Sequence, residues 1–138
     1  RHYPVLVEKT IGYFYSIIMA IQIFGTGKCF ETKKAQRFFK ERRVNFQFID
    51  LKEKGFSKGE LEAVVNSLAK DFSGKEEVLD FIADPKNKDF ASFKYLDDED
   101  KFHKILDNPL LVKTPVVRNT TEKKASVGFC PEKWENWS

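Results

Sequence analysis

Cysteine, methionine, glycine and proline are all scarce in this sequence, and the scarcity excludes several classes of protein. The two cysteines lie far apart and form no disulfide framework, so we expect free thiols and a reducing, cytoplasmic location. Seven glycines and five prolines in 138 residues are too few for extended disorder. The chain is long enough for one buried core and too short for two ordinary domains.

Long hydrophobic runs are missing as well. The uncharged apolar run at residues 11–24 is shorter than the ~20 residues that a membrane-spanning helix needs, and no small-residue cleavage site follows it. We therefore expect no membrane association. The only methionine, Met19, stands inside this run. We hypothesise that residues 19–138 form the working domain and that residues 1–18 are an N-terminal extension; the alternative is an added strand or helix.

Charge is unevenly distributed along the chain, although the net charge is only +3. Residues 28–43 contain seven lysines and arginines against two glutamates, whereas acidic residues dominate residues 76–107. Either these are two solvated helix faces, or the basic one attracts anions. Direct binding to nucleic acid is not expected, because the basic run lacks interleaved exposed aromatics and no zinc-finger or helix-turn-helix pattern accompanies it.

A strand, a helix and a second strand are predicted for the first part of the domain. Residues 20–24 have a strand pattern that ends at a turn containing Gly25 and Gly27. Residues 31–43 repeat apolar side chains at helical spacing, and residues 44–50 alternate as a strand does. Because a helix connects them, the two strands should be parallel.

Helices dominate the middle of the chain. They are expected at residues 57–68, 74–83 and 97–106, with a polar loop at 86–91. The first of them begins with a capping box, in which Ser57 precedes Glu60 by three positions.

An antiparallel hairpin and a last helix close the chain. The hairpin strands are predicted at residues 112–118 and 125–129, and the helix at 132–137. This order predicts an α/β fold: a thioredoxin-like mixed four-stranded sheet, with a helical insertion at about residues 56–108.

Cys29 is the main candidate for chemistry. It follows Gly27 and Lys28 where a strand leads into a helix, so the free N–H groups and the positive end of the helix dipole should face its sulfur. This environment and the charge of Lys28 favour the thiolate, which is the nucleophilic form of cysteine. The alternative is a buried, inert cysteine.

Two other side chains bear on this thiol. Thr32 either donates a hydroxyl hydrogen bond to the sulfur or is an ordinary first-turn threonine. Cys130 is either a resolving thiol or a core cysteine, and we favour the core interpretation. Because position 32 is not cysteine, no disulfide can form within the first turn of the helix.

Three motifs resemble segments of the arsenate reductase (ArsC)-like proteins, which include the YffB and Spx branches. They are FGTGKCFETKKA at residues 24–35, NPLLVKTPVV at 108–117 and VGFCPEKW at 127–134. The resemblance covers nearly the whole chain after Met19. It implies that Cys29 is the redox cysteine and that Pro115 is a cis-proline facing it across a cleft.

A set of residues around Cys29 and Pro115 is expected to bind the substrate or a thiol. The set comprises Gly27, Lys28, Phe30, Thr32, Thr114, Pro115 and Arg118; Arg118 is either a substitute for a missing arginine or, more plainly, a strand residue on a solvent face. Thr114 stands where arsenate reductases have an arginine, and threonine cannot replace the bidentate contact of arginine with an oxyanion. Arsenate reduction is therefore not favoured.

The sequence thus predicts a thiol-dependent oxidoreductase with Cys29 as nucleophile and glutathione or another thiol as co-substrate. Its partners would be a small thiol or a redox protein, and no bound cofactor or metal is expected. The alternative is an Spx-like transcriptional regulator that binds RNA polymerase, although such regulators carry a second cysteine where this chain has Thr32. A third possibility is a scaffold that has lost its chemistry.

Overall fold

The computed structural model describes residues 20–137, so the hypothesis about residues 1–18 lies outside the described residues. Strands and helices follow one another as β1 (Ile21–Gly25), α2 (Phe30–Glu41), β2 (Phe46–Asp50), α3 (Lys58–Leu68), η1 (Ala69–Asp71), α4 (Lys75–Ile82), α5 (Phe90–Phe93), α6 (Asp98–Asp107), η2 (Pro109–Leu111), β3 (Val116–Asn119), β4 (Lys124–Val127) and α7 (Pro131–Trp134). No helix within this range is both long and apolar enough to cross a bilayer.

The four strands form one mixed sheet in the order β2-β1-β3-β4. β1 and β2 are parallel, as the connecting helix requires, while β3 runs antiparallel to both β1 and β4. All helices between α3 and η2 are inserted between β2 and β3. The structure therefore has the thioredoxin-like sheet and the helical insertion expected from the sequence.

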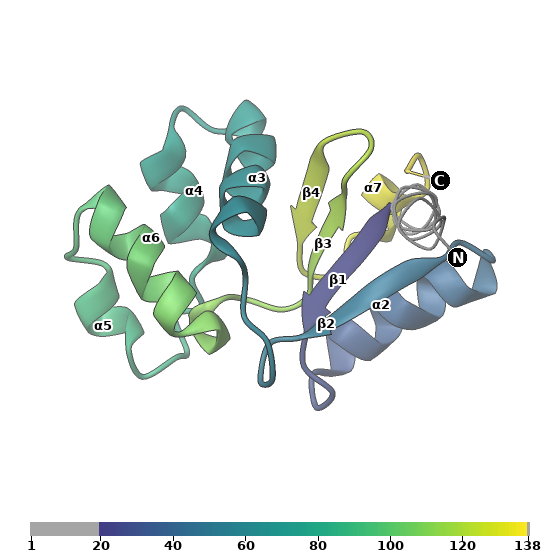
Figure 1. Cartoon of the computed structure of the whole chain (residues 1–138), viewed down its shortest axis with the longest axis horizontal. Coiled ribbons are helices and arrows are strands. Elements are labelled where there is room, and N and C mark those ends of the chain that lie inside the picture. Colours follow the sequence, from purple (N-terminus) through teal and green to yellow (C-terminus); the bar gives the residue numbers. More distant parts are fainter. Residues whose placement is uncertain (1–19, 138) are drawn as a thin grey trace, which may run out of the picture.

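Each face of the sheet packs against its own group of helices, because side chains alternate along each strand. Phe24 and Val116 point toward the insertion and join a core with residues of α3, α4 and α6. Ile23 and Val117 point the other way and join α2 and α7, where Trp134 is buried. Figure 1 shows the two groups of helices on opposite sides of the sheet.

The capping box at the start of α3 is present as predicted. The Glu60 N–H donates to Ser57 Oγ at 3.1 Å, and the Ser57 N–H donates to Glu60 Oε1 at 2.9 Å. Two of the free N–H groups at this helix terminus are thereby satisfied. The capping box fixes where the helical insertion begins.

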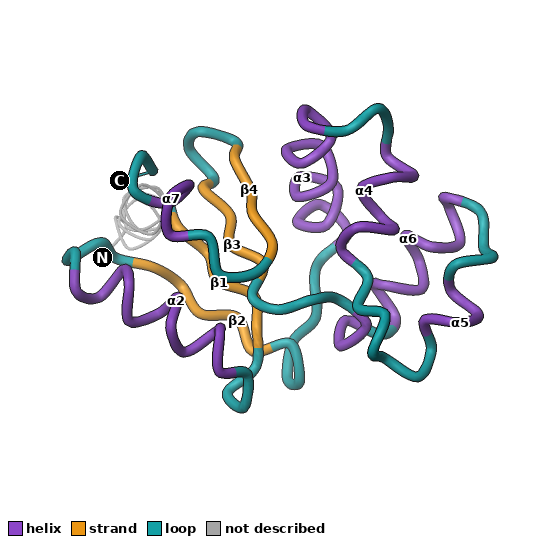
Figure 2. The backbone as a smooth tube through the Cα atoms, turned by 180° about the vertical axis from the view of Figure 1, so that it is seen from behind, coloured by secondary structure: helices purple, strands orange, loops and turns teal. Residues whose placement is uncertain are grey.

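Several element boundaries differ from the sequence prediction, and the two largest differences lie in the helical insertion and just before β3. The predicted strand at residues 112–118 starts only at Val116, because Lys113 donates its N–H to Ile82 at the end of α4 and Pro115 has no N–H to donate. The predicted loop at 86–91 ends at residue 89, where the short helix α5 begins, and Phe93 in this helix is completely buried. Figure 2 shows the loop that leads from the helical insertion back into β3.

Candidate active site

The turn after β1 places Cys29 at the start of α2. The Cys29 N–H donates to the Thr26 carbonyl at 3.1 Å, and the Cys29 carbonyl accepts from the Lys33 N–H at 3.2 Å. Cys29 is thus the N-cap residue, with extended backbone angles and a half-buried side chain. Its sulfur lies at the positive end of a twelve-residue helix, where an anion is stabilised.

Close packing beneath the thiol holds the first turn of α2 against the sheet. Thr32 is fully buried, and its Oγ1 has no hydrogen-bond partner in the described part of the chain. A Cβ on Gly25 would come within 2.6 Å of Thr32 Cγ2, so only glycine fits at the end of β1. The glycine in this turn is therefore required by contact with the helix.

The loop before β3 brings Thr114 to the sulfur. The Thr114 hydroxyl lies 3.1 Å from Cys29 Sγ and donates to it, while the thiol can donate to the Thr114 carbonyl at 3.7 Å. The Thr114–Pro115 peptide bond is cis, and Pro115 is buried. The structure therefore places the cis-proline segment next to Cys29, in the arrangement that the resemblance implied.

The pKa of the Cys29 thiol lies below its ordinary value. Partial burial is the largest single influence and raises the pKa, but hydrogen bonds to the sulfur together outweigh it. The Thr114 hydroxyl has the largest lowering effect, and the Thr32 side chain and the backbone N–H groups of Thr32 and Glu31 lower the pKa further from the first turn of α2. The site thus favours the thiolate, the form that attacks disulfides and other electrophiles.

Comparison with known proteins assigns the family. Residues 24–137 match the model of the ArsC family. The chain belongs to the ArsC family. No curated protein matches the sequence of this family member at a significant level.

Solved structures share the fold of this ArsC family chain. An arsenate reductase from Vibrio cholerae has a TM-score of 0.71 and 18% identity, over 87% of this chain and 98% of that one. A protein from Bacteroides fragilis described as ArsC family related has a TM-score of 0.69 and 20% identity, over 87% and 100%. An ArsC related protein from Brucella melitensis has a TM-score of 0.53 and 22% identity, over 86% and 94%. Placement in the YffB or Spx branch stays a prediction.

The ArsC family chain carries an exposed aromatic side chain directly after its cysteine. The Phe30 ring is 70% exposed, and Lys34 Nζ lies 5.3 Å from its centroid and 5.0 Å from that of Phe129. Lys28 is also exposed beside the thiol. These groups give the outer edge of the site an apolar contact and positive charge, which suit a ligand with a carboxylate.

Two residues of the predicted binding set do not contact the thiol. Gly27 is exposed, with open space where a Cβ would be. Arg118 pairs with Gln22 near the start of β1, whereas Cys29 follows the end of that strand. Its guanidinium donates to Gln22 Oε1 at 2.8 Å. The structure therefore does not bring Arg118 to the cysteine.

Cys130 lies in the packing around α7. Its thiol donates to the Val127 carbonyl at 3.3 Å, and burial raises its pKa. Both cysteines are free. Cys130 is partly buried against the core between α2 and α7, and its pKa is raised where that of Cys29 is lowered.

Sequence reasoning named Thr114 as a residue of the binding set but missed its hydrogen bond to the sulfur. The only signal in the sequence was its position directly before Pro115.

Among the described residues, no group of three or more His, Cys, Asp or Glu side chains is arranged to hold a metal ion.

Proposed function

We propose that this protein is a thiol-dependent reductase that uses Cys29 as its nucleophile. The observation that supports this most strongly is the sulfur at the start of α2, with the Thr114 hydroxyl donating to it at 3.1 Å. Both features stabilise negative charge on sulfur, and the reaction requires no bound cofactor.

The reaction would proceed by two thiol–disulfide exchanges. The Cys29 thiolate attacks one sulfur of a substrate disulfide, forms a mixed disulfide and releases the other half of the substrate as a thiolate. A second thiolate, from glutathione or a redox protein, then attacks the substrate sulfur of the mixed disulfide. Cys29 leaves as the thiolate, stabilised again by Thr114, and the attacking thiol ends as a disulfide with the substrate fragment.

Glutathione is the small thiol that we favour as co-substrate. It carries carboxylates, and positive charge is available near the cysteine: Lys28 is exposed directly before it, and the half-buried Lys34 lies over the ring of Phe30. Arsenate is not proposed as the substrate, because a threonine precedes the cis-proline and Arg118 is held at Gln22, away from the sulfur. Arsenate would need the bidentate contacts that arginine makes with oxyanions.

Regulation through RNA polymerase is not proposed. The spacing of Cys29 and Thr32 lacks the second cysteine of the regulator's redox switch. No feature of residues 20–137 supplies a separate argument for that function.

The proposal is tested by following the reduction of a glutathionylated peptide in the presence of glutathione. Wild type and Cys130→Ser should both release the peptide thiol, and mass spectrometry should find a glutathione adduct on Cys29. Cys29→Ser should be inactive while keeping the fold. Equal activity of Cys29→Ser and wild type would refute the proposal.

A further inference from the structure

A basic groove lies between the end of α3 and the β3–β4 hairpin, on the face of the sheet that carries the helical insertion. It has a volume of about 310 Å³. Its polar lining consists of Lys70, Arg118 and Lys123 with Asn66, Ser67 and Thr120. No carboxylate belongs to this lining, so three cationic groups share one hollow with neutral hydrogen-bonding side chains.

Two of the three cations of the groove are held in place by neutral groups. Lys70 Nζ donates to the Lys123 carbonyl at 3.4 Å, which ties η1 to the hairpin turn. The Arg118 guanidinium donates to Gln22 Oε1 at 2.8 Å, and Gln22 in turn donates to Gln47. This polar row crosses three adjacent strands and fixes the guanidinium in the floor of the groove.

None of the three cations forms an ion pair within the described residues. Glu60 attracts Arg118 only at longer range, and burial lowers the pKa of Arg118 more strongly than Glu60 raises it. Three positive groups that converge without a counter-charge repel one another, and a bound anion would remove this repulsion.

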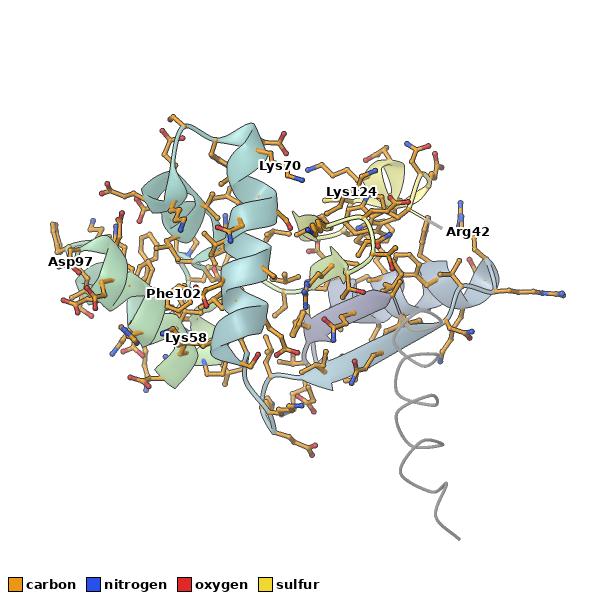
Figure 3. The ribbon with its side chains drawn as sticks, turned by 45° about the horizontal axis from the view of Figure 1, so that its top comes forward. Arg42, Lys58, Lys70, Asp97, Phe102 and Lys124 are labelled. Atoms are coloured by element: carbon orange, nitrogen blue, oxygen red, sulfur yellow. The ribbon has the colours of Figure 1, made fainter. Side chains whose placement is uncertain are left out.

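The positive surface continues beyond the groove. A neighbouring groove shares Ser67, Lys70 and Lys123 and adds Lys124 and Lys133, with Asp71 as the only acidic residue in its lining. Figure 3 shows Lys70, in η1 just after α3, and Lys124, at the start of β4, on neighbouring elements. Lys124 is already paired with Glu122 at 3.2 Å, so it contributes less to the field than the other lysines.

We propose that the groove binds the phosphate group of a small anion, either inorganic phosphate or a phosphate ester. A planar guanidinium can hold two oxygens of such a group, while ammonium, hydroxyl and amide groups supply further donors around a tetrahedral oxyanion. The volume is that of a small-ligand pocket. Arg118 points into this groove and away from Cys29, so the site is independent of the proposed thiol chemistry.

The test is an NMR titration of backbone amides with inorganic phosphate and, separately, with glycerol phosphate. Saturable shifts should centre on Ser67, Lys70, Thr120 and Lys123. Arg118→Gln and Lys123→Gln should each weaken the affinity about tenfold, as expected for the loss of a charge-assisted hydrogen bond. The ligand that binds more tightly identifies the source of the phosphate group.

The matched control is Lys75→Gln, which removes the same charge from a different groove, one that also contains Glu62, Asp98 and Glu99. It should leave the affinity unchanged. The proposal is overturned if neither ligand gives saturable shifts, if the shifts centre on Glu31 and Thr32 at the start of α2, or if the control weakens binding as much as the groove variants do. Lys123 is exposed in a turn, so Lys123→Gln should fold. Its phosphate affinity alone can be compared with wild type if Arg118→Gln does not fold.

Discussion

The Thr114 hydroxyl donates a hydrogen bond to Cys29 Sγ across 3.1 Å, although 85 positions separate the two residues in the sequence. The contact joins the loop before β3 to the start of α2. The chemical state of the cysteine therefore depends on the tertiary packing of the sheet as well as on its own helix.

Removing this hydroxyl should make Cys29 less reactive. Thr114→Val keeps the shape of the side chain but removes the donor, so the pKa of Cys29 should rise and its alkylation at neutral pH should slow several-fold. Thr114→Ser retains the donor and should stay close to wild type. Alkylation rates are measured by mass spectrometry. Equal rates for the valine and serine variants would show that the Thr114 hydroxyl does not activate Cys29.

Stability should depend on pH through the same thiol. The pKa of Cys29 is lowered in the folded protein, so the native state binds fewer protons than the unfolded chain between the two pKa values. Ionisation of Cys29 therefore stabilises the folded state. This stabilisation increases as pH rises from the folded pKa to the unfolded value of ~8.5, and it is lost as pH falls through the folded pKa. Urea unfolding at several pH values gives the free energy of unfolding of wild type and of Cys29→Ser. The difference between the two should grow over this pH interval; a constant difference would contradict the lowered pKa.

The two glycines that flank Thr26 should respond differently to alanine. Gly25→Ala forces a methyl group against Thr32 and should destabilise the fold by about 1–3 kcal/mol, the usual effect of overpacking. Gly27→Ala meets open space and should have little effect on stability. Thermal unfolding compares the two variants, and equal losses of stability would show that the contact with Thr32 is unimportant.

An ion pair between a buried lysine and an exposed aspartate links α4 and α6 in the helical insertion. Lys101 is 2% exposed, and its Nζ lies 2.6 Å from Asp80 Oδ1. Asp80→Asn leaves the buried ammonium without its counter-charge and should cost about 1–3 kcal/mol, since Asp80 itself is partly solvated. Lys101→Met replaces the chain with an apolar one of similar length and should cost less. Denaturant unfolding would refute this ranking if the methionine variant were the less stable.

Much of the fold follows from local patterns in the sequence. Alternating strands around one amphipathic helix define the parallel β1–β2 pair, and the Ser57 capping box locates the start of α3. The position of Cys29 at the helix N-terminus could be predicted for the same reason, because it follows directly from a strand, a glycine turn and a helix.

The features that could not be predicted depend on contacts between distant segments. Val112 and Lys113 have the composition of a strand, yet they pair with the end of α4 instead of the sheet. The hydrogen bond from Thr114 to Cys29 and the convergence of Lys70, Arg118 and Lys123 both arise from packing between elements that no local pattern connects.

The proposed chemistry requires the folded protein to hold Cys29 as a stabilised thiolate. Its most direct test is the rate of Cys29 alkylation as a function of pH, measured in the Cys130→Ser variant so that one thiol reports alone. The midpoint of this titration should lie clearly below the ~8.5 of a free cysteine. A midpoint at or above that value would contradict it.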